Sequence, residues 1–365
     1  MPSSVVGGRT AQLSTAAWVE DIQCRVATAM NINAEFVNVE GRRKGFTGSN
    51  MRCWGTAAGV RFFAKIYLVD PYPIPPRFAT PGEELASPEK PQRAVEEQIT
   101  VEWNMVQEMR SLVGTHNIPA PLGCSIENRV LVFEEVSGLR LDRFVNWGWP
   151  HGQKTRSAVV ALQMAGASLR ALHDSSCQGY ETIDLCEGVE ALRGLMRKKE
   201  IESTPYARRA LKVLESTRQN LTPRTSLRVP VALNHGDFSL PNLIWNSDRQ
   251  HVWMIDFELS SYRPILHDLC TLIATLRSQL LRPFTSPRIV ELLEEAFWRG
   301  YGPVSEDIRT IVKGLSCAWL FYHIFPRIST LRERRGWAGG LKALVFKTLL
   351  QHIIIARILR VQRSQ

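Results

Sequence analysis

Five polar residues within one short stretch of the chain have the types and the spacing to bind a metal ion and to accept a proton. His235, Asp237 and Asn242 form the pattern His-x-Asp-x4-Asn, and Asp256 and Glu258 follow after a mostly apolar segment. Asparagine and aspartate oxygens are the hard ligands that Mg²⁺ takes, usually as one or two carboxylates together with substrate phosphates. A carboxylate just before such ligands stands where a base would accept the proton of an attacking hydroxyl.

The segment between Asn242 and Asp256 has the pattern of a β-hairpin. Apolar runs at 243–245 and 252–255 enclose a polar turn, which is typical of two short antiparallel strands. Such a hairpin places Asn242 and Asp256 side by side at its open end. A polar turn followed by a strand end is the structural alternative, but it explains the two motifs together less well than a metal site does.

Three stretches resemble the motifs of the aminoglycoside phosphotransferase and choline kinase superfamily. They are HGDFSLPN from His235 to Asn242, MIDFE from Met254 to Glu258, and SYRPILHDL from Ser261 to Leu269, which ends with a structural aspartate, Asp268. The resemblance implies an α+β, two-lobed protein-kinase-like fold. Its N-terminal lobe would be an antiparallel sheet with a helix, and its larger C-terminal lobe would be mainly helical.

The resemblance also implies a role for each residue of the motifs. Asp237 would be the catalytic base, and His235 would fix the loop by hydrogen bonds. The residues expected to hold Mg²⁺ are Asn242, Asp256 and Glu258. For His173 and His267, which precede aspartates elsewhere in the chain, we expect structural roles.

Lys65 is the candidate phosphate ligand, because it lies in the otherwise apolar strand VRFFAKIYLV. Lysine is rarely buried without a partner, although its stem can also carry the charge to solvent. The resemblance implies that Lys65 binds the α- and β-phosphates of a nucleotide and pairs with a glutamate on the next helix. We expect Glu102 to be that partner, with Glu96, Glu97 and Glu108 as alternatives.

Two further segments are expected to hold the nucleotide by their backbone. GRRKGFTGSN, from Gly41 to Asn50, stands where a kinase has its glycine-rich loop, and glycines let backbone amides approach phosphate closely. The residues expected to do so are Gly45, Gly48 and Ser49. The strand RVLVF and the residues that follow it resemble the link between kinase lobes, which holds the base of the nucleotide. The expected linker residues are Phe133, Glu134 and Val136.

Periodicity predicts where the remaining elements lie. A segment with seven prolines, 71–91, is too irregular for a helix or strand and is expected to be a surface insertion. The expected strands are 34–39, 50–54, 60–69 and 129–133. The expected helices are 14–30, 92–113, 156–173, 188–224 with a break at Pro205, 265–281, 286–301, 305–325 and 341–359.

Length and composition favour an ordered, two-lobed intracellular protein. With 365 residues and about 150 residues per domain, we expect a nucleotide-binding lobe at 1–135 and a catalytic, substrate-binding lobe at 136–365. The seven cysteines form no CxxC pair, which favours a reducing cytoplasm over a disulfide framework or a zinc site. No segment has the pattern of a signal peptide or of a transmembrane helix.

The net charge of +10 is concentrated in two places. Residues 326–365 carry nine Lys or Arg against one acid, and residues 187–224 carry nine against five. The first surplus is expected to be a solvated helix face and tail, with contact to an anionic membrane surface as the alternative. The second lies where the family binds its acceptor, and it favours a neutral or anionic acceptor over a polycationic aminoglycoside. The chain has no recognisable nucleic-acid-binding module.

These expectations combine into an ATP- and Mg²⁺-dependent phosphotransferase that acts on the hydroxyl of a small molecule, such as a sugar, an amino alcohol or a lipid-linked sugar. GTP in place of ATP is left open, as is the oligomeric state. A nucleotide-binding pseudokinase of the same fold is the alternative, and the joint presence of Lys65, Asp237, Asn242 and Asp256 disfavours it. A protein kinase is disfavoured too, because the chain has IDFE in place of DFG and no APE motif follows.

Overall fold

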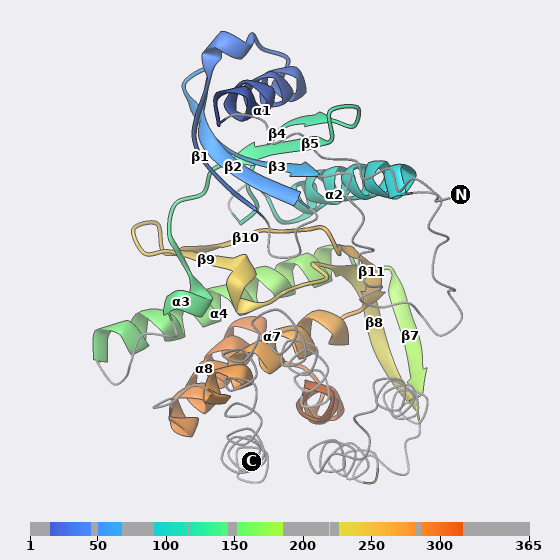
Figure 1. Cartoon of the computed structure of the whole chain (residues 1–365). Coiled ribbons are helices and arrows are strands. Elements are labelled where there is room, and N and C mark those ends of the chain that lie inside the picture. Colours follow the sequence, from blue (N-terminus) through green and yellow to red (C-terminus); the bar gives the residue numbers. More distant parts are fainter. Residues whose placement is uncertain are drawn as a thin grey trace, which may run out of the picture. The chain divides into compact units, whose positions relative to one another are not determined.

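The computed structural model describes residues 15–44, 50–67, 91–114, 117–144, 152–184, 219, 226–281 and 286–316. The chain separates into two compact units (Figure 1). The N-terminal unit is Met1–Asn104 with Ala120–Glu135, and the C-terminal unit is Met105–Pro119 with Val136–Gln365. Residues 105–119, which we expected in the first lobe, group with the second unit. Among the described residues no helix combines the length and the apolar character needed to cross a membrane.

The N-terminal unit is an antiparallel five-stranded sheet in the order β1-β2-β3-β5-β4. Its strands are β1 (Val37–Lys44), β2 (Asn50–Ala57), β3 (Val60–Tyr67), β4 (Pro121–Ser125) and β5 (Val130–Glu134). The expected strand at 34–39 begins as a short 3-10 turn, η1 (Ala34–Phe36), and β4 was not expected.

Helix α1 (Thr15–Met30) packs on one face of this sheet because its apolar positions recur at helical spacing. Ile22 and Val26 are fully buried against Cys53, Phe62 and Val132 of three strands. The other long helix near this sheet, α2 (Pro91–Val113), begins in the N-terminal unit. Its last residues belong to the C-terminal unit, where the Tyr262 hydroxyl donates to Glu108 at 2.5 Å.

The C-terminal unit combines helices with two small sheets. Its labelled helices are α3 (Leu141–Phe144), α4 (Gly152–Ser175), η2 (Leu240–Asn242), α7 (Leu266–Ser278), η3 (Gln279–Leu281) and α8 (Pro287–Tyr301), and residues 306–316 are helical too. One sheet has the order β10 (His251–Met254), β9 (Leu243–Asn246), β6 (Leu139–Arg140), and the other β11 (Ser261–Pro264), β8 (Ser226–Asn234), β7 (Gly179–Asp184). The hairpin was expected, whereas the second sheet was not.

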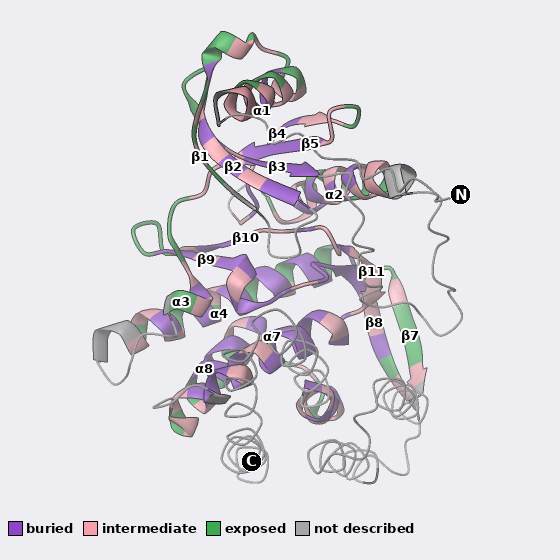
Figure 2. Ribbon diagram, in the orientation of Figure 1, coloured by how far each residue is buried: buried purple, intermediate pink, exposed green. Residues whose placement is uncertain are grey.

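Helices α4, α7 and α8 form the core of this unit, and their contacting faces are buried (Figure 2). Two glycines allow α4 and α8 to lie in backbone contact. A side chain at Gly166 would overlap the carbonyl oxygen of Phe297, and one at Gly300 would overlap that of Gln163. The close approach of the two helices therefore requires glycine at both positions.

A buried ion pair joins α7 to α8. The Arg277 guanidinium donates to both carboxylate oxygens of Glu294, at 3.1 and 2.8 Å, and also to the Lys313 carbonyl and to Ser316 Oγ. Both side chains are 1% exposed. An unpaired buried charge is costly, so removing either residue alone would leave the other charge without its partner and destabilise the protein.

Replacing Arg277 alone should therefore destabilise the protein strongly. We expect Arg277→Met to lower the free energy of unfolding by about 3–5 kcal/mol, and Arg277→Met with Glu294→Met to recover most of that loss. Asp21→Ala, which breaks a half-exposed pair with Arg25 in α1, is the control and should cost less than about 1 kcal/mol. Urea denaturation measures all three. A double variant as unstable as Arg277→Met would contradict the interpretation.

Candidate active site

The predicted hairpin brings Asn242 and Asp256 together. In the β9–β10 ladder Leu243 pairs with Met254, so the residues on either side of this pair meet at the open end. There the backbone N–H of Ile255 donates to the carbonyl of Asn242 at 3.0 Å. Asn242 and Asp256 thus end up as neighbours although thirteen residues separate them.

Asn242 also holds Asp237. Its amide nitrogen donates to the backbone carbonyl of Asp237 and to carboxylate Oδ2 of the same residue, both at 3.0 Å. These bonds fix the direction of the Asp237 carboxylate. Because the amide nitrogen is used in this way, the side-chain oxygen of Asn242 is the atom suited to a metal.

The oxygens at the end of the hairpin fit Mg²⁺ in type. Asp256 has a φ of 73°, a left-handed conformation that costs energy for a residue with a side chain and often marks functional sites. Glu258 lies two residues further on and is partly exposed. No cluster of three or more His, Cys, Asp or Glu that could hold a metal occurs among the described residues. A metal bound by Asn242 and Asp256 would therefore also need oxygens from substrate phosphates and water, as Mg²⁺ commonly does.

His235 is a buried, neutral part of the loop. Its side chain is 0% exposed, and the imidazole lies 4.8 Å from the Phe257 ring and 5.8 Å from the Phe238 ring. Burial lowers the pKa of His235 below its usual value, so the ring carries no charge at neutral pH. A neutral ring packed between aromatic side chains is suited to supporting the loop, whereas the expectation from the sequence was that His235 fixes the loop by hydrogen bonds.

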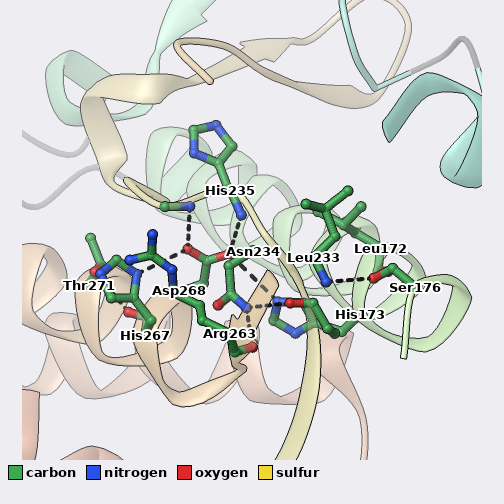
Figure 3. Close-up of polar contacts among 12 residues, drawn as sticks. Leu172, His173, Ser176, Leu233, Asn234, His235, Arg263, His267, Asp268 and Thr271 are labelled. Carbon is green, nitrogen blue, oxygen red and sulfur yellow. Dashed lines mark hydrogen bonds and ion pairs between the residues drawn. The ribbon is translucent and has the colours of Figure 1, made fainter. Parts of the chain in front are cut away.

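Asp268 anchors the loop from the first turn of α7 (Figure 3). Its carboxylate is fully buried and accepts the backbone N–H groups of His235, at 2.6 Å, and of Gly236, at 2.9 Å. Although burial alone would raise it, interactions with His173 and His267 hold the pKa of Asp268 well below its usual range. The carboxylate is therefore ionised at neutral pH.

Histidines flank this carboxylate from two helices. His173 Nε2 lies 3.6 Å from Asp268 Oδ2, and His267 Nδ1 lies 3.7 Å from Oδ1. The other ring nitrogen of His173 meets the hydroxyl of Tyr301, at 2.8 Å. The interaction thus continues from the loop through α4 to the end of α8.

Sequence reasoning missed the residues that hold the strand before the loop. Asn234, which is fully buried, donates to the carbonyls of Ala232 and Arg263 and so fastens β8 to β11. Ser176 Oγ accepts the N–H of Leu233 at 2.9 Å. The polar type of Asn234 at the end of an apolar strand was the available signal, but Arg263 lies far from Asn234 in sequence, and Ser176 lies far from Leu233.

In the N-terminal unit Lys65 meets Glu102. Lys65 Nζ lies 2.6 Å from Glu102 Oε1, and the two side chains are 3% and 1% exposed. Of the four glutamates considered, this is the one expected. The Tyr67 hydroxyl donates to the second oxygen, Oε2. Tyr67 was not singled out from the sequence, although it lies two residues after Lys65 and therefore on the same face of β3.

The other expected nucleotide contacts are described only in part. Phe133 and Glu134 end β5, and the backbone N–H of Glu134 donates to the Ala120 carbonyl at 2.8 Å. Val136 follows as the first residue of the chain's return to the C-terminal unit. The remaining expectations concern segments that lie outside the described residues, apart from residues 91 and 219. These segments are Gly45, Gly48 and Ser49, the insertion 71–91, the basic segment 187–224 and the basic C-terminus 326–365.

Gly236 is required by both its conformation and its surroundings. Its φ is +85°, and a side chain there would overlap the backbone carbonyl of Leu259. Gly302, after α8, has the same φ of +85° but no atom within 4 Å of the position of a side chain. The two glycines therefore share a positive φ and differ in how closely other backbone atoms approach them.

Alanine at these two positions should separate the two effects. We expect Gly302→Ala to cost about 1–3 kcal/mol of stability, because its φ of 85° and ψ of −168° lie in a backbone region that is almost restricted to glycine. Gly236→Ala should cost clearly more, since the loop must also move away from Leu259. Thermal and urea unfolding of both variants measure the difference. Equal losses would show that the contact with Leu259 does not constrain the loop.

The chain resembles solved structures of antibiotic phosphotransferases in fold. A macrolide 2′-phosphotransferase type I shares 13% sequence identity, with 90% of this chain and 97% of that chain covered and a TM-score of 0.53. An aminoglycoside 2′-phosphotransferase-IIIa mutant in complex with GDP shares 15%, with 91% and 99% covered and a TM-score of 0.52. APH(2″)-IIia in complex with GDP and kanamycin shares 13%, with 90% and 97% covered and a TM-score of 0.51.

These matches confirm the kinase-like α+β fold expected from the sequence. A search among curated protein sequences finds no match. The sequence model of the phosphotransferase enzyme family matches residues 38–310, a range that includes Lys65, Glu102 and the whole loop from His235 to Asp268. Since this range is well over half of the chain, the chain belongs to the phosphotransferase enzyme family.

Proposed function

We propose that this phosphotransferase is a small-molecule kinase that uses Mg²⁺ and ATP, or GTP, to phosphorylate a hydroxyl of a neutral or anionic acceptor. The observation that carries the proposal is that Asp237, Asn242 and Asp256 lie together at the open end of the β9–β10 hairpin. One asparagine holds the carboxylate of Asp237 at 3.0 Å and lies beside Asp256 at the end of one hairpin. A base and metal ligands held together in this way are the parts that phosphoryl transfer requires.

Asp237 is the residue we assign to the acceptor. Its carboxylate is only partly buried, so a hydroxyl can approach it, and the Asn242 amide fixes its direction. The carboxylate would orient the hydroxyl and take its proton as the oxygen attacks the γ-phosphorus. His235 would contribute only through the position of the loop, because its ring is buried among aromatic side chains.

Asn242, Asp256 and, through its water shell, Glu258 are the residues we assign to Mg²⁺. When bound, the ion supplies charge stabilisation to the transferring phosphoryl group. Lys65, which forms an ion pair with Glu102 at 2.6 Å, would bind the nucleotide phosphates. The linker residues Phe133, Glu134 and Val136 would hold the base, and Gly45, Gly48 and Ser49 would cover the phosphates.

The acceptor class rests on charge. The nine Lys or Arg at 187–224 disfavour a polycation in the acceptor site, since like charges repel. A kanamycin complex is known for one protein of similar fold, but such a ligand carries several positive charges. A sugar, an amino alcohol or a lipid-linked sugar suits a basic surface better.

A screen of hydroxyl compounds tests the proposal directly. Sugars, amino alcohols, amino acids and aminoglycosides would each be added to the full-length protein with Mg²⁺ and ATP or GTP, and ADP or GDP release would be measured. Release stimulated by a neutral or anionic compound supports the proposal. Stimulation by aminoglycosides alone would overturn the acceptor class, and nucleotide binding without transfer to any acceptor would favour the pseudokinase alternative.

Removing the base should stop transfer and leave nucleotide binding intact. Asp237→Asn keeps the shape of the side chain but cannot take a proton, so we expect kcat to fall by about a hundred- to ten-thousandfold with an unchanged Kd for the nucleotide. Asp248→Asn, in the exposed turn of the same hairpin, is the matched control and should be fully active. Undiminished turnover by Asp237→Asn would remove Asp237 from this role.

Removing the metal ligand should act on nucleotide binding instead. We expect Asp256→Asn to raise the Kd of the triphosphate in the presence of Mg²⁺ by at least about tenfold, because Mg²⁺ is held by only one or two carboxylates. With EDTA in place of Mg²⁺ the variant and the wild type should bind alike. Calorimetric titration measures both, and identical affinities in Mg²⁺ would exclude Asp256 from the metal site.

A further inference from the structure

The residues that follow the expected linker lie on the surface, where the burial of apolar side chains contributes little to their position. Ser137 and Gly138 are exposed, and Leu139 is 58% exposed. Strand β6, which begins at Leu139, has only two residues and pairs with β9. Because so short a strand forms few ladder hydrogen bonds, further contacts are needed to fix this segment of the chain.

Asn246, at the end of β9, supplies such a contact. Its amide nitrogen donates to Ser137 Oγ at 2.9 Å and to the Ser137 carbonyl at 3.3 Å. Its side-chain oxygen accepts the backbone N–H groups of Asp248, at 3.1 Å, and of Arg249, at 2.9 Å. Asn246 is 6% exposed, and both ends of its amide group are hydrogen-bonded. One buried side chain thus closes the hairpin turn and fastens the segment after the linker.

The residue type at position 246 is explained by the contact with Ser137, because the turn alone would accept aspartate. Aspartate and asparagine both close turns through a side-chain oxygen that accepts backbone N–H groups. Only asparagine also has a nitrogen that donates, and this nitrogen contacts Ser137. Gly138 serves the same contact, since its φ is 140° and a side chain there would overlap the carbonyl oxygen of Trp245. Two successive residues after the linker are therefore fitted to β9.

Strand β9 connects this contact with the proposed metal site. It runs from Leu243, directly after Asn242, to Asn246, which at about 3.3 Å per residue is a length of roughly 10 Å. Val136, the last residue expected to hold the base, directly precedes Ser137. One short strand thus joins the end of the expected linker to a metal ligand. A nucleotide that contacts both would require this distance to be fixed before it binds.

We propose that Asn246 is a positioning residue for the nucleotide, which holds the linker at Val136 in the conformation that receives the base. This inference rests on the proposed function, because it assumes that the linker contacts a nucleoside triphosphate. Without the contact to Ser137, the exposed segment would have to be ordered when the ligand binds, and that ordering lowers affinity. The loss would be the same for every ligand that contains the base, whatever its number of phosphates.

A binding series on the full-length protein tests this role. Adenosine, AMP, ADP and a nonhydrolysable ATP analogue are titrated with Mg²⁺ by calorimetry, with the guanosine series in parallel. Asn246→Asp retains the oxygen that closes the turn and removes the donor, although the Ser137 hydroxyl can then donate to the new carboxylate. Asn246→Asp combined with Ser137→Ala removes that possibility as well. Gly138→Ala disturbs the same contact from the side of the linker.

We expect the double variant to bind the nucleoside and the nucleotides of the preferred base more weakly by one common factor, about five- to tenfold. Asn246→Asp and Ser137→Ala alone should lose less, and Gly138→Ala should show a uniform loss too. Two controls should bind as the wild type does. Ser247→Ala changes an exposed residue of the same turn, and Arg277→Met destabilises the protein away from the linker.

Three results would overturn the inference while the proposed function stands. They are a loss confined to the ligands with phosphates, no loss in a double variant whose thermal unfolding shows it to be folded, and an equal loss in Arg277→Met. The expected pattern also differs from that of Asp256→Asn, whose loss should depend on Mg²⁺ and the triphosphate. Failure of the wild type to bind any nucleoside or nucleotide would overturn both the inference and the proposed function.

Discussion

The position of the loop that carries Asp237 depends on one buried carboxylate. Asp268 is completely withdrawn from water, and an ion in that position is tolerated only when its oxygens are satisfied by donors. The donors nearest in space are the backbone N–H groups of His235 and Gly236. The loop must therefore pass over the start of α7, and Asp237 follows at a fixed distance along the chain.

Two residues with an expected chemical role, Asp237 and Glu102, are each held by other polar side chains. Asn242 holds Asp237, and Glu102 is held by Lys65 and Tyr67 from β3. Such supports leave the side chains little freedom before a ligand arrives. In the proposed phosphoryl transfer, where positioning and charge stabilisation do most of the work, this pre-organisation would itself contribute to catalysis.

Local patterns predicted the parts of this arrangement that arise from local structure. The β9–β10 hairpin follows from two apolar runs and a turn, whereas Glu102 was chosen among four glutamates from the position that the family resemblance implies. The sheet of β7, β8 and β11 was missed, because its pairings join segments far apart in sequence and its outer strands are only partly buried. Tyr67 was missed because an aromatic residue in an apolar strand suggests core packing, and only the structure shows its hydroxyl meeting Glu102.

Two buried ion pairs among the described residues show why burial alone does not identify a functional charge. Arg277 and Glu294 join two helices, and the guanidinium also reaches the Lys313 carbonyl and Ser316, so protein groups surround it. Lys65 and Glu102 are buried to a similar degree, and the Tyr67 hydroxyl donates to the second oxygen of Glu102. A pair surrounded by complementary groups is explained by stability. Burial and pairing alone therefore do not identify which of the two pairs has a role beyond stability.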